Sequence, residues 1–191
     1  MADPFSKSGL PIPKFASGRI YGSQYYDTIG GAASVTTTST RLTYQPFFVQ
    51  SAITFTRAYT YNNGAGDNGD TYRTGAYTDS NGSPGTLILD FGEVTLTGAS
   101  AMRTQTISLN LAPYVGQIIW LCDHANQAAG MYGWNTFLAN LPNNQMFGAY
   151  SASFSATPSL YVDTAYGALA STAVAPTAGI QAVIKLFLGT P

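Results

Sequence analysis

The side chains that could carry out catalysis are few in this chain. His124 is the only histidine, so it is the only imidazole available as a general base near neutral pH. It follows Asp123 and stands two residues after Cys122, the only cysteine. Neighbouring side chains of a strand point to opposite faces, so Asp123 would not orient the imidazole. No Gly-x-Ser-x-Gly turn offers a nucleophile. We therefore predict no catalytic residue here, with His124 at a turn at the end of a strand.

Cleavage of a glycosidic bond needs two carboxyl groups about 5–10 Å apart in a cleft. The carboxylate side chains are Asp3, Asp27, Asp67, Asp70, Asp79, Asp90, Glu93, Asp123 and Asp163. Their spacing in the sequence defines no such pair. A polysaccharide-degrading enzyme is therefore a distant alternative, and we expect the protein not to be an enzyme.

Metal and cofactor sites are not expected either. Residues 67–70 (DNGD) place oxygen ligands on a tight loop, as calcium sites do, but the twelve-residue loop and bidentate Glu of an EF-hand are missing. A hairpin turn explains these residues without an ion. The glycines form no phosphate-binding or dinucleotide motif. Cys122 has no disulfide partner and lies in an apolar run, which predicts a small buried side chain.

The aromatic residues suggest a binding function. After the apolar run 117–122 (QIIWLC), rings alternate with amide and carboxylate side chains in what we expect to be a loop. Flat rings beside hydrogen-bonding groups suit a sugar, which has an apolar face and a rim of hydroxyls. The candidate glycan-binding residues are Asp123, Asn126, Tyr132, Trp134 and Asn135. The alternative is that the two rings are buried and anchor the loop.

The rest of the chain predicts β-structure. Strands rich in Thr, Tyr, Phe and Val are expected at 42–50, 52–61, 71–78, 86–91, 103–111, 117–122, 145–154, 160–162 and 181–188. Turn sequences such as Asn81-Gly82 separate them, and only 134–141 has helical character. The run 117–122 is typical of a central strand covered on both faces. We predict one antiparallel β-sandwich over residues 21–191.

Residues 1–20 hold three prolines and show no strand or helix period, which predicts an extended N-terminal arm. The arm nevertheless carries the apolar residues Phe5, Leu10, Ile12 and Phe15. Such an arm is expected to lie against a surface, either its own domain or a neighbouring subunit. We take these four residues as candidate assembly contacts.

The composition excludes several classes of partner. Charged residues make up 9% of the chain, against about a quarter in ordinary soluble domains, and the net charge is -1. The eight Lys and Arg residues are scattered, which argues against nucleic-acid binding. No window approaches the roughly 20 apolar residues that span a bilayer, and the first residues do not look like a signal peptide. We expect synthesis in the cytoplasm and no membrane insertion.

Several segments together resemble a domain of phage tail and tail-fibre proteins. They are 17–21 (SGRIY), 41–49 (RLTYQPFFV), and 75–87 (GAYTDSNGSPGTL) followed by 90–94 (DFGEV). Residues 106–111 and 118–121, with Trp120, are similar to the two strands that follow in that family. The resemblance covers about residues 17–125.

The resemblance implies a jelly-roll-like β-sandwich on the exterior of a virion, where such domains bind cell-surface carbohydrate. It implies as partners other virion proteins, further copies of the chain in a homo-oligomer (most simply a trimer) and host glycan. It transfers no ligand residues. Because the domain fills nearly the whole chain, a capsid decoration or head-spike protein that binds only virion proteins is the alternative.

Overall fold

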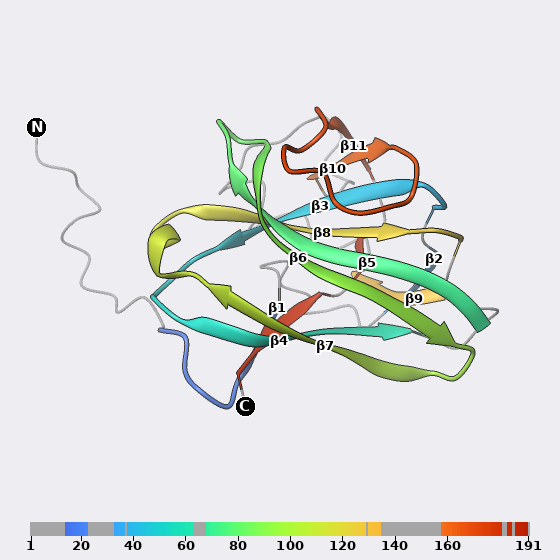
Figure 1. Ribbon diagram of the computed structural model, residues 1–191, viewed down its shortest axis with the longest axis horizontal. Helices are drawn as coiled ribbons and strands as arrows, with labels where there is room; N and C mark the ends of the chain where they lie inside the picture. The colour runs from blue at the N-terminus through green and yellow to red at the C-terminus, as the bar shows by residue number, and fades with distance from the viewer. Residues whose placement is uncertain are drawn as a thin grey trace, which may run out of the picture.

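The computed structural model describes residues 14–22, 33–36, 38–62, 68–128, 130–134, 158–180, 183–184 and 186–190. Within these ranges every strand pairing is antiparallel, and the strands form two sheets packed face to face (Figure 1). The only helical element described is a short 3-10 turn, η1 (Ala112–Tyr114), so no described helix could cross a membrane. The predicted fold class, an all-β antiparallel sandwich, is confirmed.

Sheet A has the order β1 (Ile20–Gly22), β13 (Phe187–Gly189), β4 (Thr54–Asn62), β9 (Gly130–Trp134) and β12 (Val183–Ile184). Two further strands lie off this path, β2 (Ala33–Thr36) on β9 and β7 (Ala101–Asn110) on β4. The predicted strand 145–154 lies outside the described residues, as does the segment 134–141 apart from Trp134, which ends β9.

Sheet B has the order β11 (Thr177–Ile180), β10 (Pro158–Asp163), β3 (Arg41–Phe48), β8 (Ile118–Ala125), β5 (Asn68–Asp79) and β6 (Pro84–Thr97). Figure 1 shows β10, β3, β8 and β5 in this sequence from the top of the view downward. β8 lies between β3 and β5, and its residues from Ile119 to Ala125 are buried. The prediction that 117–122 forms a central strand covered on both faces is confirmed.

The two faces of β8 enter different apolar clusters because its side chains alternate. Ile119 and Leu121 face sheet A and belong to the main core, which includes Phe47, Phe55, Leu109 and Leu188 from both sheets. Trp120 and Cys122 point the other way, into a cluster on the outer face of sheet B. Cys122 is a buried free thiol, as predicted.

Residues 164–174 cover that outer face and add a third layer over sheet B. Tyr77 donates to the carbonyl of Ala170 (3.0 Å), and Leu87 N donates to that of Ser171 (2.9 Å). Leu169 packs so closely on Gly75 that a Cβ there would lie 2.3 Å from Leu169 Cδ1. Glycine at position 75 therefore allows the covering segment to approach the sheet.

The hairpin between β5 and β6 has the predicted turn chemistry. Asn81 and Gly82 both have positive φ, at 54° and 81°. Two positive φ values give a turn whose twist matches the strands it joins, and Asn and Gly tolerate them best. The carboxylate of Asp79, the last residue of β5, accepts a hydrogen bond from Gly82 N (3.1 Å). This bond closes the turn.

The end of the predicted arm belongs to the sandwich. The Phe15 ring lies 4.8 Å from Tyr21, 5.7 Å from Phe47 and 5.3 Å from Phe55, measured between ring centroids. Phe15 N also donates to Ser51 Oγ (3.0 Å). The interpretation of Phe15 as an assembly contact is therefore corrected, because its ring completes the edge of its own core. Phe5, Leu10 and Ile12 lie outside the described residues.

Truncation at two points tests this assignment. Deleting residues 1–13 removes no described contact, whereas deleting residues 1–16 removes the Phe15 ring and its bond to Ser51. We expect the longer deletion to lower stability by about 2 kcal/mol relative to the shorter one, a shift of several degrees in a thermal melt. Phe15→Ala in the full chain should reproduce the loss. Equal melting temperatures for both truncations would contradict the assignment.

Candidate functional site

The prediction that a glycan-binding loop begins directly after residue 122 is wrong, because the chain continues there as a strand. β8 continues through Ala125, so Asp123 and His124 are strand residues, and Tyr132 and Trp134 lie on β9. The backbone of Tyr132 pairs with Ser34 and that of Trp134 with Val183, and the structure describes no more of these two residues. Asn135 lies outside the described residues.

Asp123 points into the space between the sheets. It lies beside Thr43 of β3 and Thr74 of β5 and is 4% exposed. Within the described part of the chain its Oδ1 has no hydrogen-bond partner, and burial raises its pKa to about 8. In this chain the carboxyl group is not at the surface, where a glycan would meet it.

Asn126 has a structural role at the end of the β5–β8 pair. Its N donates to Thr71 O (3.0 Å), and its Oδ1 accepts from Thr71 N (2.9 Å). These two bonds use the backbone N and the side-chain oxygen of Asn126, and they fix the first residue after β8. Of the five predicted glycan ligands, Asp123 is buried and Asn126 bonds the backbone of Thr71, whereas the side chains of Tyr132, Trp134 and Asn135 lie outside the described residues.

His124 points to the opposite face from Asp123, as strand alternation predicts. Its Nε2 lies 3.3 Å from Thr164 O, and its ring centroid lies 5.1 Å from that of Tyr166. Burial lowers its pKa, against the opposing effect of backbone hydrogen bonds to Thr164 and Thr40. The adjoining cavity, of about 50 Å³, has room for a few waters and not for a sugar. The geometry makes His124 an attachment point for the covering segment.

Most of the described carboxylates have structural partners. Asp79 accepts from Trp120 Nε1 (2.8 Å), Asp90 from Arg73 (2.8 Å) and Glu93 from Tyr166 (2.7 Å), while Asp163 pairs with Arg41 (2.7 Å). Their hydrogen bonds hold turns, strands and the covering segment in place. No two of these four form an open pair across a described cleft.

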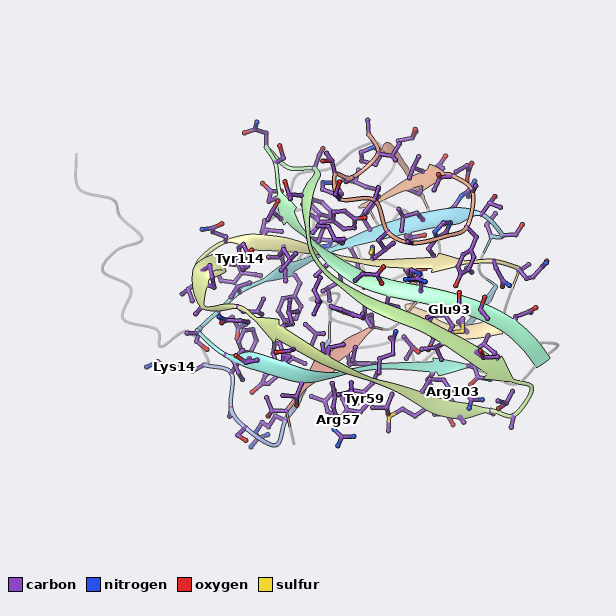
Figure 2. All side chains as sticks on the ribbon, in the orientation of Figure 1. Lys14, Arg57, Tyr59, Glu93, Arg103 and Tyr114 are labelled. Carbon is purple, nitrogen blue, oxygen red and sulfur yellow. The ribbon has the colours of Figure 1, made fainter. Side chains whose placement is uncertain are left out.

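The outer face of sheet A has no covering segment among the described residues. We call the exposed patch on β4 and β7 the tyrosine face and define it by Arg57, Tyr59, Tyr61, Met102, Thr104 and Thr106. The register places Arg57 opposite Thr106, Tyr59 opposite Thr104 and Tyr61 opposite Met102. Directly opposed residues share a face, so the six side chains form one surface. Figure 2 shows Arg57 reaching away from the ribbon, with Tyr59 beside it on β4.

An irregularity in the pairing of β4 with β7 creates this face. Phe55 opposes Leu109, but Arg57 opposes Thr106, so one residue of β4 faces two of β7 at this bulge. Phe55 is fully buried and Arg57 is exposed, although strict alternation would put both on the same side. Beyond the bulge, the even-numbered residues of β4 point inward and its tyrosines point outward.

Tyr59 is held in place by the strand beside it. Its ring lies over Gly189 of β13, where an added Cβ would lie 2.8 Å from a ring carbon and 3.4 Å from Ile20 Cγ1. Any larger residue at position 189 would displace the ring. Tyr59 is therefore a half-buried ring with a defined position, and Tyr61, 39% exposed, is the more open of the pair.

The tyrosine face offers rings and neutral hydroxyls without a carboxylate. Tyr59 and Tyr61 supply apolar faces with polar tips, and Thr104 and Thr106 are exposed hydroxyls directly across the strand pair. Such a surface can stack on a sugar ring and bond its hydroxyls at the same time. Alternation in 103–111 separates Thr104 and Thr106 from the core positions, whereas no pattern in the sequence identifies the tyrosines as outward-facing.

No protein-family model, curated protein or solved structure significantly matches this chain. The resemblance to phage tail domains and the function that it implies therefore stay predictions.

Asp123 makes stability depend on pH. The folded chain keeps this carboxyl protonated up to about pH 8, whereas an unfolded Asp ionises above about pH 4. The folded state therefore binds more protons in this window, and stability falls as pH rises through it. Asp123→Asn should remove this dependence. Between pH 5 and pH 8 the free energy of unfolding of the native chain should therefore fall by on the order of 3–4 kcal/mol relative to that of the variant.

Urea unfolding of both proteins at the two pH values measures this difference. Asp70→Asn, at a half-buried carboxylate on β5, serves as the control for removal of a carboxyl group elsewhere in the sandwich. If the difference in unfolding free energy between the native chain and Asp123→Asn is the same at both pH values, Asp123 is ionised in the folded state.

Proposed function

We propose that this chain is a non-catalytic structural protein on the surface of a tailed-phage or phage-like particle, of the tail-fibre or spike type, and that it contacts host glycan through the tyrosine face. The observation that supports this most is the face itself, which no described segment covers. Two tyrosines lie on it opposite Met102 and exposed threonine hydroxyls, whereas the outer face of sheet B is covered by residues 164–174.

The chemistry of the face favours a sugar as ligand. A tyrosine ring buries the apolar face of a pyranose at about 25 cal/mol per Å², and the neighbouring hydroxyls can donate or accept without a net charge to desolvate. Single contacts of this kind are weak. Several copies on one particle would hold a cell through avidity.

The assignment to a particle rests on composition and on the resemblance of residues 17–125. A chain with 9% charged residues suits a protein that is packed into an assembly. In this proposal the protein is made in the host cytoplasm and reaches the surface as part of the virion. The non-catalytic role is supported by the buried His124 and by the structural partners of Asp79, Asp90, Glu93 and Asp163.

A capsid decoration or head-spike protein that binds only virion proteins is the second candidate. Ile20 (53% exposed) and Met102 (54% exposed) are large apolar residues on the outer face of sheet A. Exposed apolar side chains on a flat sheet also suit a protein interface. Labelling the protein in intact particles and testing those particles for glycan binding separates the two candidates.

Substitution of the rings tests the glycan proposal. Tyr61→Ala should weaken monovalent glycan binding about tenfold, because one lost stacking contact corresponds to roughly 1–2 kcal/mol. Its melting temperature should change little, since the side chain is exposed. Tyr59→Ala should weaken binding as much and lower stability slightly, because its ring packs over Gly189. Glycan-array binding followed by calorimetry on the best ligand measures these effects.

Three controls sharpen the result. Tyr161→Ala removes a half-buried tyrosine of sheet B and should leave binding intact. The Arg41 Cζ lies 4.2 Å from the centroid of this ring. Trp134→Ala tests the site predicted from sequence on β9. Loss of binding with Trp134→Ala but not with the tyrosine variants would place the glycan on β9. Release of reducing sugar would instead identify an enzyme.

The proposal also predicts self-association. Light scattering on the full-length protein at tens of micromolar should give an oligomer, most simply a trimer as in threefold tail appendages. A monodisperse monomer at that concentration would argue strongly against a fibre or spike. Comparison with the chain lacking residues 1–13 tests whether the arm that carries Phe5, Leu10 and Ile12 mediates the contact.

A further inference from the structure

We infer that the tyrosine face binds an acidic glycan and that Arg57 receives its carboxylate or sulfate group. This inference rests on the proposed function, because it names the substrate class of the same face. It comes from an uneven distribution of charge between the two sheets.

The carboxylates of the described residues all lie on one sheet. All six are on strands of sheet B: Asp70 and Asp79 on β5, Asp90 and Glu93 on β6, Asp123 on β8, and Asp163 on β10. The described strands of sheet A carry Arg57 and Arg103 and no carboxylate. Among the described residues, the outer face of sheet A therefore carries the guanidinium of Arg57 and no carboxylate.

The arginines differ in how they are held. Arg41 and Arg73 pair with carboxylates of sheet B, and Arg103 donates from Nε to Asn62 Oδ1 (3.0 Å). Arg57 is exposed and has no hydrogen bond or ion pair with a described residue. Its guanidinium is the one on the tyrosine face, and its planar fork matches a carboxylate or sulfate in two parallel bonds.

The spacing of the face suits one sugar and its acidic group. Arg57 and Tyr59 are two residues apart on β4, about 7 Å along the strand. Thr106 and Thr104 face them across the pair, with Cβ atoms about 5 Å away. A sugar ring stacked on Tyr59 therefore places a ring substituent within reach of Arg57, while the two hydroxyls remain close to the sugar's own hydroxyls. A neutral glycan would use the tyrosines of this face but would gain nothing from Arg57.

Matched pairs of glycans test the inference with the full-length protein. The probes are glucuronate and glucose oligomers, sialylated and asialo N-acetyllactosamine, and sulfated and unsulfated galactans. We expect the acidic member of at least one pair to bind more tightly than its neutral parent. Arg57→Gln should weaken that acidic ligand about fivefold, the size of a good exposed ion pair, and leave the neutral parent unchanged.

Two further variants exclude a general charge effect. Lys14→Gln removes another exposed cation, which Figure 2 places away from Arg57, and should change acidic binding less than twofold. Arg57→Lys keeps the charge but loses the planar fork, so it should restore only part of the affinity. An equal loss with Lys14→Gln and Arg57→Gln would overturn the inference, because binding would then follow net charge alone.

The outcomes separate this inference from the proposed function. Equal or tighter binding of the neutral parents, lost with Tyr61→Ala, would overturn the acidic ligand and leave glycan binding in place. Acidic binding unaffected by Arg57→Gln would overturn the role of Arg57. Absence of binding to every probe, acidic and neutral, would count against the proposed function itself.

Discussion

The bulge between Phe55 and Arg57 decides what both faces of sheet A present. Here one residue of β4 opposes two of β7, and the alternation of β4 changes phase. Without that change Tyr59 and Tyr61 would join Phe55 inside the sandwich, and Ala58 and Thr60 would face solvent. One irregularity thus moves the tyrosines outward while it moves polar side chains into the interior.

Beyond the bulge, the phase change brings Thr60 and Asn62 of β4 into the interior, where hydrogen bonds link several of the buried polar side chains. Buried polar residues from both sheets gather there: Thr43, Gln45, Thr60, Asn62, Thr74, Gln105 and Asp123. Thr60 bonds the Tyr72 hydroxyl, Thr74 donates to Gln105 Oε1 (2.6 Å), and Asn62 donates to Ala99 O (2.8 Å). These bonds cross between the sheets or tie down strand ends, so they fix how the layers stack. Burial of Asp123 in this layer raises its pKa to about 8 and so favours the neutral acid.

The sequence predicts the fold well where each strand follows one period. Alternation in 103–111 separates Thr104 and Thr106 from Ile107 and Leu109, and the apolar run 117–122 correctly indicates a strand with two covered faces. Prediction from the sequence fails where contacts between distant segments determine whether a side chain is buried. Asp123 and His124 look like turn residues, yet one is buried in the polar layer and the other under residues 164–174. A phase change caused by a partner strand leaves no local pattern, so the outward tyrosines could not be predicted.

The third layer explains why the two outer faces of the sandwich present different side chains. Residues 164–174 bury the aromatic and sulfur side chains on the outside of sheet B, and the carboxylates Asp90 and Glu93 bond that segment through Leu169 N and the Tyr166 hydroxyl. Two of the six described carboxylates of sheet B thus help to hold its cover. Among the described residues, the outer face of sheet A has no cover and no carboxylate, and Arg57, Thr104 and Thr106 are exposed on it. A ligand that approaches this described surface meets tyrosine, threonine and arginine side chains.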